Sequence, residues 1–437
     1  MAHANLPGVR RDPISFLFSL LTYLLFPPFL LFFAVRLICK PEYRARWPER
    51  FGRYPHMRRH PHQALFWVHA VSVGEVLASD VFIRHLRARY PDVVLVVSTG
   101  TPTGQATARR RLSGVDHFIY FPFDFPWIVR RAVRTLIPCA FFCFETELWP
   151  HFLRALAREG APAFLVNGRL SSKSFQGYHK ARFFFRPALQ GVSLFLMQTP
   201  RDMERIIALG APCERVTCVG NIKYDQAISG SRGTETAPAL RAALGIGDAP
   251  LMIAASLHPG EDATVLAAYA RLKTDFPALV LLMAPRHLTR VPSVEQEVRG
   301  QGWTCVRKRD VDGPHDASVI LLDTLGELAG LYAVGDVVFV GGSLVPVGGH
   351  NILEPAAFRK PILFGPHMDN FQEIAEQMKQ AGGGIEVANT DQMAERMAHL
   401  LTHPSERAER GEAAFRVVQD HQGAVERTLD RVAAWIK

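Results

Sequence analysis

Residues 341–365, which read GGSLVPVGGHNILEPAAFRKPILFG, decide the fold of this 437-residue chain. They follow residues 336–340, a short apolar run that is typical of a buried parallel strand. The two glycine pairs, at 341–342 and 348–349, allow tight turns and a close approach of ligand to backbone. A second apolar run over 360–364 completes an order of strand, glycine loop, helix and strand. This order is half of a nucleotide-binding α/β domain.

Polar residues after the second glycine pair predict a site for phosphate and ribose. Asn351 can cap a helix that begins there, and the free N–H groups of a helix start attract anions. Glu354 lies one turn further on, where its carboxylate can accept hydrogen bonds from a ribose diol. The alternative is a glycine loop that closes an α/β turn without binding a ligand. The spacing matches neither G-x-G-x-x-G nor a P-loop, which disfavours a nicotinamide dinucleotide or a kinase-type ATP site.

Length and composition favour a two-domain protein with anionic partners. The chain is 48% hydrophobic and carries a formal net charge of +9. Such a charge favours anionic lipid, phosphorylated substrates or nucleic acid as partners. The six cysteines are scattered without the spacing of a zinc site, and Cys139 and Cys143 lie in an apolar run. This pattern favours reduced cysteines and a body that faces the cytosol.

Residues 14–35 form an uncharged segment that predicts a membrane anchor. As a helix these 22 residues would be about 33 Å long, close to the roughly 30 Å of hydrocarbon in a bilayer. Pro27 and Pro28 are expected to kink the segment, so that it either spans the bilayer or forms a bent, re-entrant anchor. A cleaved signal peptide is disfavoured because no small-residue cleavage site follows. Eight Lys and Arg residues against two Glu residues between 36 and 59 predict a cytoplasmic body on an anionic membrane surface.

Apolar runs that alternate with segments of helical length predict two parallel sheets. The first series comprises residues 65–68, 93–97, 118–120, 140–144, 163–166 and 194–197. The second comprises residues 251–255, 279–284, 319–322, 337–340 and 362–364. The predicted organisation is an anchor over 1–40, a Rossmann-like domain over 41–225, a linker over 226–240 and a second Rossmann-like domain over 241–437, which includes the C-terminal helices.

Polar residues gather directly after the strands of the first series. They are Glu75, Ser98 and Thr99, Glu145 and Glu147, and Asn167 and Arg169. Ligands of open α/β sheets bind beyond the carboxyl ends of the strands, so these residues predict one site, although each could be a capping group. The second series contributes glycines and Arg286. Two doubly wound domains that face each other across a cleft are the glycosyltransferase B (GT-B) arrangement, and this is the predicted α/β fold.

At this point the chain resembles the Kdo transferases, the family that adds 3-deoxy-D-manno-octulosonic acid (Kdo) to lipid A precursors. The motifs that carry the resemblance are HAVSVGE (69–75), STGTPTG (98–104), ETELWP (145–150), NGRLS (167–171), GNIKYD (220–225), APRH (284–287), LGE (325–327) and GGHNILEP (348–355). Each motif is modest alone, and their shared order between residues 67 and 366 is what makes the resemblance specific.

The resemblance implies a reaction and a set of site residues. Kdo passes from CMP-Kdo to a hydroxyl of lipid IVA, or to a Kdo already there, with no metal or other cofactor and no nucleic-acid partner. Glu75 is implied as the general base on the acceptor hydroxyl, and Glu145 and Lys223 as groups that stabilise the transition state. The implied location is the cytoplasmic side of the inner membrane. The implied CMP-binding residues are Pro285, Arg286, Leu325, Gly326, Glu327, Asn351, Ile352, Leu353 and Glu354.

Some of these residues also have a purely structural interpretation. Glu75 can complement a helix dipole, Glu145 can pair with Arg169, and Arg286 can form a surface ion pair. The segment 169–186 interleaves basic and aromatic residues. It is either an amphipathic helix on the core or an interfacial contact for the acyl chains and phosphates of the acceptor.

Two other classes of protein share features of this chain. A UDP-sugar epimerase or a UDP-dependent lipid glycosyltransferase would have the same fold. A membrane-bound RNA-binding protein would share the positive charge, although the sequence has no RRM or KH signature.

Overall fold

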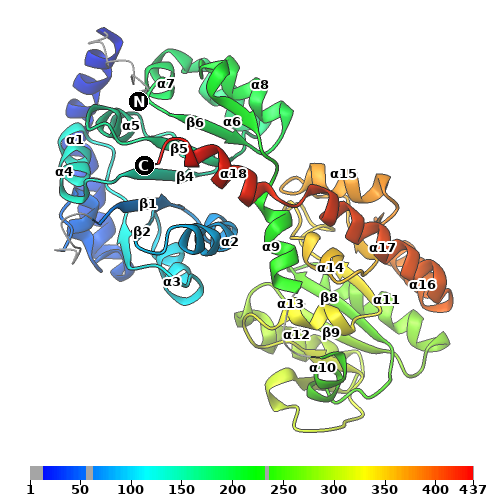
Figure 1. The fold of residues 1–437 in the computed structure, drawn as a ribbon. Helices are drawn as coiled ribbons and strands as arrows, with labels where there is room; N and C mark the ends of the chain where they lie inside the picture. Colours follow the sequence, from blue (N-terminus) through cyan, green and yellow to red (C-terminus); the bar gives the residue numbers. More distant parts are fainter. Residues whose placement is uncertain (1–12, 56–62, 232–235, 437) are drawn as a thin grey trace. The chain divides into compact units, whose positions relative to one another are not determined.

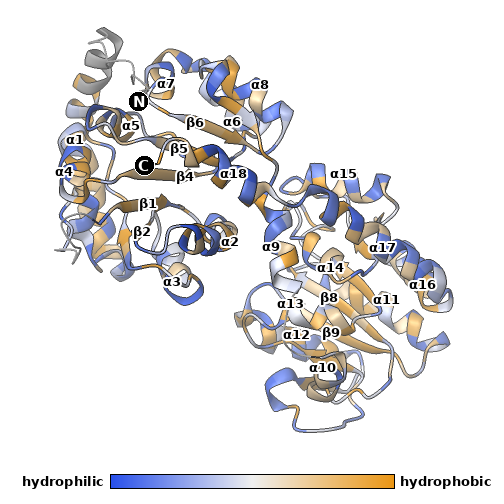
Figure 2. Ribbon diagram, viewed as in Figure 1, coloured by the Kyte–Doolittle hydropathy of each residue, from blue (hydrophilic) through white to orange (hydrophobic). Residues whose placement is uncertain are grey.

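The structure is a computed structural model that describes residues 13–55, 63–231 and 236–436. The chain divides into two compact units, Met1–Asp225 with Gly423–Lys437, and Gln226–Gln422. Each unit contains one seven-stranded sheet in which every pairing is parallel (Figure 1). Figure 2 shows apolar residues along the strands and polar residues on the surrounding helices. The predicted α/β class with two doubly wound domains is confirmed.

The sheet of the first unit has the strand order β3-β2-β1-β4-β5-β6-β7. Residues of β1 alternate between its faces, because Trp67 packs in one buried cluster while Phe66 and Val68 pack in the other. The chain direction across the sheet reverses between β1 and β4, which is where doubly wound sheets bind ligands. The strands are β1 (Leu65–His69), β2 (Val94–Thr99), β3 (His117–Tyr120), β4 (Ala140–Phe144), β5 (Ala163–Gly168), β6 (Leu194–Met197) and β7 (Val216–Cys218).

Helices cover both faces of this first sheet. They are α1 (Pro13–Cys39), α2 (Val73–Arg89), α3 (Pro102–Arg111), α4 (Pro126–Leu136), α5 (Pro150–Arg158), α6 (Ser172–Lys180), α7 (Arg182–Leu189), α8 (Pro200–Ala208), α9 (Ile222–Ser231) and α18 (Ala424–Ala433). Short 3-10 turns lie at η1 (Pro41–Tyr43), η2 (Trp47–Phe51) and η3 (Cys213–Arg215).

The last helix belongs to the first unit and not to the second domain, where it was predicted. Val425, Leu429 and Val432 of α18 are buried in the same cluster as Phe66. The carboxylate of Asp225 accepts the backbone N–H groups of Gly423 and Val425, which caps the start of α18. This cap and the buried apolar face fix the helix to the first unit, and they correct the predicted boundary.

The predicted linker over 226–240 is largely helical. Helix α9 crosses the boundary between the units and ends at Ser231, whose Oγ donates to the backbone oxygen of Ile228 at 2.9 Å. Helix α10 (Ala237–Ala243) begins after Thr236, whose side chain accepts the N–H of Ala239. Ser231 and Thr236 therefore act at helix ends, and residues 232–235 lie outside the described residues.

The sheet of the second unit has the strand order β10-β11-β9-β8-β12-β13-β14. The strands are β8 (Leu251–Leu257), β9 (Val280–Pro285), β10 (Cys305–Arg307), β11 (Val319–Leu321), β12 (Val337–Val340), β13 (Ile362–Phe364) and β14 (Gly384–Glu386). The helices are α11 (Asp262–Asp275), α12 (Val291–Gly300), α13 (Leu328–Leu331), α14 (Leu353–Ala357), α15 (Gln372–Gln380), α16 (Thr390–Thr402) and α17 (Pro404–His421), with 3-10 turns η4 (Leu288–Arg290), η5 (Lys308–Asp310) and η6 (Tyr332–Val334).

Three strands were absent from the prediction, namely β7, β10 and β14. Each has three residues and lies at an edge of its sheet. Such strands are too short to show a period and too exposed to read as apolar runs. The eleven predicted strands are all present within two residues of the expected ends.

Helix α1 continues through Pro27 and Pro28, which were expected to interrupt it. One face of the helix docks on the first unit through aromatic side chains. Phe26 and Phe29 lie 4.8 and 5.1 Å from Phe125 between ring centroids, and Phe33 lies 5.0 Å from Phe123. These contacts lie on both sides of Pro27 and Pro28. They stabilise the helix where the two prolines provide no backbone N–H donor.

The opposite face of α1 is apolar and exposed. Leu24, Leu31 and Ile38, which recur every seven residues, are 67, 69 and 71% exposed. Residues 20–39 are long and apolar enough to cross a membrane by length and composition. A helix with one docked and one bare apolar face is typical of an interfacial anchor.

Candidate functional site

Glu75 lies at the first turn of α2, directly after β1. Its carboxylate accepts the N–H of Val71 and the hydroxyl of Ser72, both at 2.8 Å. The Ser72 hydroxyl oxygen in turn accepts the N–H of Glu75, so that the two residues form a capping box. Glu75 is 8% exposed, and burial raises its pKa above the usual 4.5, with a further contribution from Glu145. The structural role considered for Glu75 is thus real, and the same geometry holds an acid with increased basicity.

Glu145 and Glu147 follow β4, next to β1 in the sheet. Glu145 has a left-handed backbone with φ of 55°, which is uncommon for a residue with a side chain. Its N–H donates to the oxygen of Val166 at 3.0 Å, so the pairing of β4 with β5 fixes this conformation. Burial, with Glu75 as the next cause, raises the pKa of Glu147 to about 7. The structure therefore groups three acids at the switch point of the first sheet.

Asn167 connects this acid cluster to Lys223. Asn167 also has a left-handed backbone, with φ of 54°, and is completely buried at the end of β5. Its Oδ1 accepts the N–H of Ile222 at 3.0 Å, which fixes the start of α9 and with it Lys223. Burial lowers the pKa of Lys223, and the opposing attraction of Glu145 is the next cause. The predicted catalytic residues Glu75, Glu145 and Lys223 therefore lie close enough to interact.

The first glycine pair of the second unit surrounds a carboxylate of the protein itself. Glu261, which has no exposed surface, accepts the N–H groups of Gly342, Ser343 and Leu344 at 2.7, 3.0 and 2.9 Å. It also accepts the N–H of His258 at 2.9 Å. A Cβ at Gly341 would lie 2.7 Å from Glu261 Oε2, so this glycine is required by packing. The amide groups of this loop therefore bind a carboxylate of the protein itself.

The residues predicted to bind phosphate and ribose lie beside a helix that begins later than expected. Helix α14 has only five residues and begins at Leu353, not at Asn351. Asn351 still accepts the N–H of Leu353 at 3.1 Å, and its Nδ2 donates to Glu354 at 3.2 Å. Because α14 is so short, its dipole is small, and side chains rather than the helix start must provide most of any attraction for an anion.

Arg286 follows β9 and is exposed, close to Glu354 and His350. Burial raises the pKa of Glu354, and Asn351 and Arg286 oppose this rise. Burial lowers the pKa of His350 to about 4, with Arg286 as the next cause. Arg286, Asn351 and Glu354, which were predicted to bind one ligand, are therefore neighbours at the end of the second sheet.

His350 of the GGHNILEP motif pairs in this region with His258, which the sequence did not single out. His258 Nε2 and His350 Nε2 are 2.8 Å apart, and the two rings stack with centroids 5.0 Å apart. Only one of the two nitrogens carries the proton of this hydrogen bond, so the pair is neutral or singly charged. A Cβ at Gly342 would meet His350 at 2.8 Å, which explains the glycine at this position.

The remaining predicted CMP residues lie beyond neighbouring strands. Pro285 is the last residue of β9 and is buried. Leu325, Gly326 and Glu327 follow β11, which pairs with β9, and Leu325 is 61% exposed. Glu327 lies 3.8 Å from Lys308. The loop thus offers an apolar side chain and backbone groups at the same edge of the sheet as Arg286.

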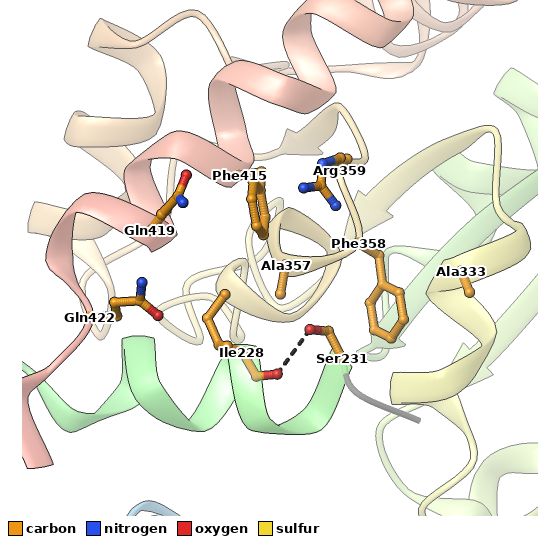
Figure 3. Close-up of a pocket in the computed structure, with 9 residues that line it drawn as sticks. All are labelled: Ile228, Ser231, Ala333, Ala357, Phe358, Arg359, Phe415, Gln419 and Gln422. Atoms are coloured by element: carbon orange, nitrogen blue, oxygen red, sulfur yellow. Dashed lines mark hydrogen bonds between the residues drawn. The ribbon is translucent and has the colours of Figure 1, made fainter. Parts of the chain in front are cut away.

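The second unit also contains a recess of about 430 Å³ at the other end of α14 (Figure 3). Its charged residue, Arg359, lies 3.8 Å from the ring centroid of Phe415 and pairs with Glu412 at 2.9 Å. The predicted donor residues do not line it. The charge of Arg359 is already balanced by Glu412, and none of the predicted donor residues lines the recess. This recess is therefore distinct from the site at the strand ends.

An Asp-x-Asp pattern, which can hold a cation on a nucleotide sugar, occurs once near this site, at Asp310 and Asp312. Both residues are exposed beside the edge strand β10. Within the described residues, His, Cys, Asp and Glu form no group of three that could hold a metal ion.

Comparisons with known proteins agree with the motifs. Residues 45–226 match the family model of 3-deoxy-D-manno-octulosonic-acid transferase (kdotransferase). A 3-deoxy-D-manno-octulosonic acid transferase of Haemophilus influenzae is 34% identical over 97% of this chain and 99% of its own length. The enzyme of the same description from Bordetella pertussis is 32% identical over 89% of this chain and 91% of its own length.

Solved structures share the two-domain fold. The UDP-GlcNAc 2-epimerase of Neisseria meningitidis bound to UDP-GlcNAc has a TM-score of 0.60, covers 84% of this chain and is 14% identical, which indicates the fold alone. The C-terminal CMP-Kdo binding domain of WaaA from Acinetobacter baumannii is 30% identical and matches 42% of this chain, with a TM-score of 0.40. On the full-length relatives, the chain belongs to the family of 3-deoxy-D-manno-octulosonic acid (Kdo) transferases.

Proposed function

We propose that this Kdo transferase moves Kdo from CMP-Kdo to a hydroxyl of lipid IVA, without a metal, and with Glu75 as the general base. The observation that carries the proposal is the grouping of Glu75, Glu145 and Lys223 at the switch point of the first sheet. These residues occupy the motif positions that the family resemblance implies for catalysis. A site built from buried acids and one buried cation suits proton removal followed by charge stabilisation.

Glu75 supplies the proton acceptor. A sugar hydroxyl is a weak nucleophile until its proton leaves, and a carboxylate with a raised pKa takes that proton more readily. In the proposed step the acceptor oxygen bonds to the anomeric carbon of Kdo and its proton passes to Glu75. The bond from that carbon to the CMP phosphate breaks with its electron pair, and CMP leaves.

Lys223 and Glu145 act on the charges that change in this step. Kdo and CMP each carry a negative charge close to the reacting carbon, and a buried ammonium group offsets part of it. The attraction of Glu145 opposes the lowering of the Lys223 pKa by burial. Because Asn167 fixes the start of α9, the ammonium group is oriented before substrate binds.

The second unit supplies the donor residues. Arg286 provides a forked donor for the single phosphate of CMP, and Glu354, held by Asn351, accepts from the ribose hydroxyls. Leu325, Gly326 and Glu327 offer backbone groups to the cytosine edge. Pro285, Ile352 and Leu353 complete the loop ends that hold these groups in place.

The proposed location is the cytoplasmic side of the inner membrane, with α1 in the interface. The docked face of α1 from Thr22 to Phe33 contacts the first unit, which favours a helix that stays on that unit over one that leaves it to span the bilayer. Its bare leucines would then enter the acyl region. The basic run from Arg44 to Arg53 adds attraction to an anionic surface, and Arg58 and Arg59 lie outside the described residues.

Nucleotide binding tests the donor half of the proposal. Titration calorimetry with the full-length protein should show binding of CMP that is at least tenfold tighter than binding of UDP. Arg286→Ala should weaken CMP binding by about 1.5–3 kcal/mol, the scale of a hydrogen bond to a charged group. The matched control is Arg271→Ala, which removes an exposed arginine on α11. Equal affinity for UDP, or unchanged affinity in Arg286→Ala, would reject this donor site.

Chelation tests the proposed independence from metals. Transfer from CMP-Kdo should continue at the same rate after dialysis against EDTA. A loss of activity that added Mg²⁺ or Mn²⁺ restores would contradict the proposal.

A further inference from the structure

A recess between α4 and α5 contains a group of cations that the transfer site does not use. It has a volume of about 460 Å³ and is lined by Pro126, Arg130, Arg134, His151, Arg154, Ala155, Arg158 and Glu159. Arg130 and Arg134 lie one turn apart on α4, and Arg154 and Arg158 lie one turn apart on α5. Like charges at this spacing repel each other, so two such pairs around one cavity favour an anion between them.

The carboxylates near the recess are too few to neutralise the charge of its arginines. Glu159 pairs with Arg134 at 2.9 Å, and Asp124 accepts the N–H groups of His151 and Phe152 at the start of α5, near Arg154. With both acids ionised, four arginines still exceed two carboxylates. In the described part of the chain, Arg130 and Arg158 form no salt bridge.

The floor of the recess is fixed, and its rim is exposed. Arg154 and His151 are only 6 and 5% exposed, whereas the side chains of Arg130 and Arg158 are open to solvent. Burial lowers the pKa of His151 to about 3, with Arg154 and Arg158 as the next causes, so this ring is neutral at physiological pH. A buried arginine below exposed arginines is a suitable arrangement for a phosphate group.

The recess adjoins the proposed membrane anchor. His151 Nε2 lies 3.0 Å from the hydroxyl of Thr22 on α1, and Tyr23 stacks on Trp127 at 4.9 Å, next to the lining residue Pro126. Leu20 and Leu21, at the same level of the helix, are 47 and 45% exposed. A molecule with a phosphate in the recess could therefore lay its acyl chains against α1.

We propose that this recess binds the phosphate of an anionic bilayer phospholipid. The proposal rests on the interfacial position proposed for α1, and it does not depend on the transfer reaction. The recess extends along both helices, from Pro126 and His151 in their first turns to Arg134 and Arg158 in their last turns. None of the acids of the transfer site lines it, which favours a structural lipid over the acceptor. The exposed apolar face of α1 favours a lipid over free phosphate.

Binding of a short-chain lipid to the full-length protein in non-ionic detergent tests this inference. Dioctanoylphosphatidylglycerol is titrated while the melting temperature and the tryptophan fluorescence are followed. Dioctanoylphosphatidylcholine and inorganic phosphate serve as the other two ligands. The wild type should bind the phosphatidylglycerol probe at least tenfold more tightly than either.

The variant Arg130→Gln with Arg158→Gln removes two exposed charges and leaves the buried floor intact. It should weaken binding of the phosphatidylglycerol probe by about tenfold, the scale of one charge-assisted hydrogen bond. The matched control, Arg110→Gln with Arg111→Gln, removes two exposed arginines from the end of α3 and should leave this affinity unchanged. CMP affinity should be unchanged in both variants, which separates this result from a failure of the donor site.

Four outcomes would overturn the inference. They are unchanged lipid binding in the α4–α5 variant, an equal loss in the α3 control, binding of inorganic phosphate as tight as that of the lipid, and a raised KM for the acceptor with unchanged phospholipid binding. The last outcome would assign the recess to the acceptor.

Discussion

Glu75 combines a structural and a chemical role in one side chain. Both of its oxygens accept hydrogen bonds within the capping box, which fixes the carboxylate at the end of β1. Burial at the same place makes it a stronger base. Because the helix cap already holds this carboxylate in place, no further group is needed to orient the base. A substitution that tests the chemical role must therefore leave the capping role intact.

Glu75→Gln should abolish transfer, with a rate at least a thousandfold lower, while CMP affinity stays within twofold. Glutamine at this position still completes a capping box, so the helix should remain capped. Ser72→Ala is the matched control, because it removes the cap and keeps the carboxylate. It should lower the free energy of unfolding by about 1 kcal/mol and retain transfer activity. The assay is transfer from CMP-Kdo, with thermal unfolding of both variants, and near-normal turnover by Glu75→Gln would exclude this base.

Glu147 should make the first unit less stable as pH rises. Its pKa is about 7 in the folded state and about 4.5 when unfolded, so between these values the folded state binds the proton more tightly. The stabilisation from this proton is fully present below pH 4.5 and is lost as pH rises through 7. Glu147→Gln should therefore melt above the wild type at pH 8, and the difference should shrink towards pH 5. Melting curves at the two pH values test this, and a difference that is the same at both would contradict it.

At the scale of elements, the strands and the order of the motifs could be predicted because apolar runs and turn residues are local signals. The role of the first glycine pair could not. Glu261 occupies the amides of the loop from 81 to 83 residues away, and no local pattern reveals that a buried carboxylate will do so. The pairing of His258 with His350 depends on the same long-range packing. The last helix was assigned to the wrong domain because its buried partners lie at the other end of the chain.

The Glu261 carboxylate should be the main support of the glycine loop. Glu261→Ala leaves the N–H groups of Gly342, Ser343, Leu344 and His258 without their acceptor, so the second unit should lose at least about 1–3 kcal/mol of unfolding free energy, the cost of leaving one buried donor unsatisfied. Glu261→Gln, which keeps one acceptor oxygen, should lose less. Denaturant unfolding measures both, and CMP affinity should fall in the same order. Equal stability of Glu261→Ala and the wild type would show that the loop is held by other contacts.

At the scale of the whole molecule, α1 has two faces with different tasks. Phe26, Phe29 and Phe33 pack on the first unit, whereas Leu24, Leu31 and Ile38 are bare. The sequence predicted an apolar helix of the right length, and it could not show that aromatic side chains on one side of this helix contact the first unit. A helix that spans the bilayer would expose both faces to lipid. An interfacial helix exposes one face to lipid and packs the other on protein.

Substitutions on the two faces of α1 should therefore change different properties. Those on the exposed face should change membrane binding, and those on the docked face should change stability. Leu24→Asn with Leu31→Asn should reduce flotation with anionic liposomes and leave the melting temperature unchanged. Phe26→Ala with Phe29→Ala should lower the melting temperature, because it removes the aromatic contacts of α1 with Phe123 and Phe125. A protease site at the N-terminus should be cut only from the cytoplasmic side of sealed inner-membrane vesicles. Cleavage from the periplasmic side would show that the helix spans.

The product of the reaction provides the most direct test of the proposed function. Purified full-length protein is incubated with CMP-Kdo and lipid IVA, and the lipid is analysed by mass spectrometry, with Glu75→Gln in parallel. Wild-type protein should add the mass of one or more Kdo residues to lipid IVA and release an equal amount of CMP, and Glu75→Gln should add none. Release of CMP without a change in the mass of the lipid, or equal Kdo addition by Glu75→Gln, would contradict it.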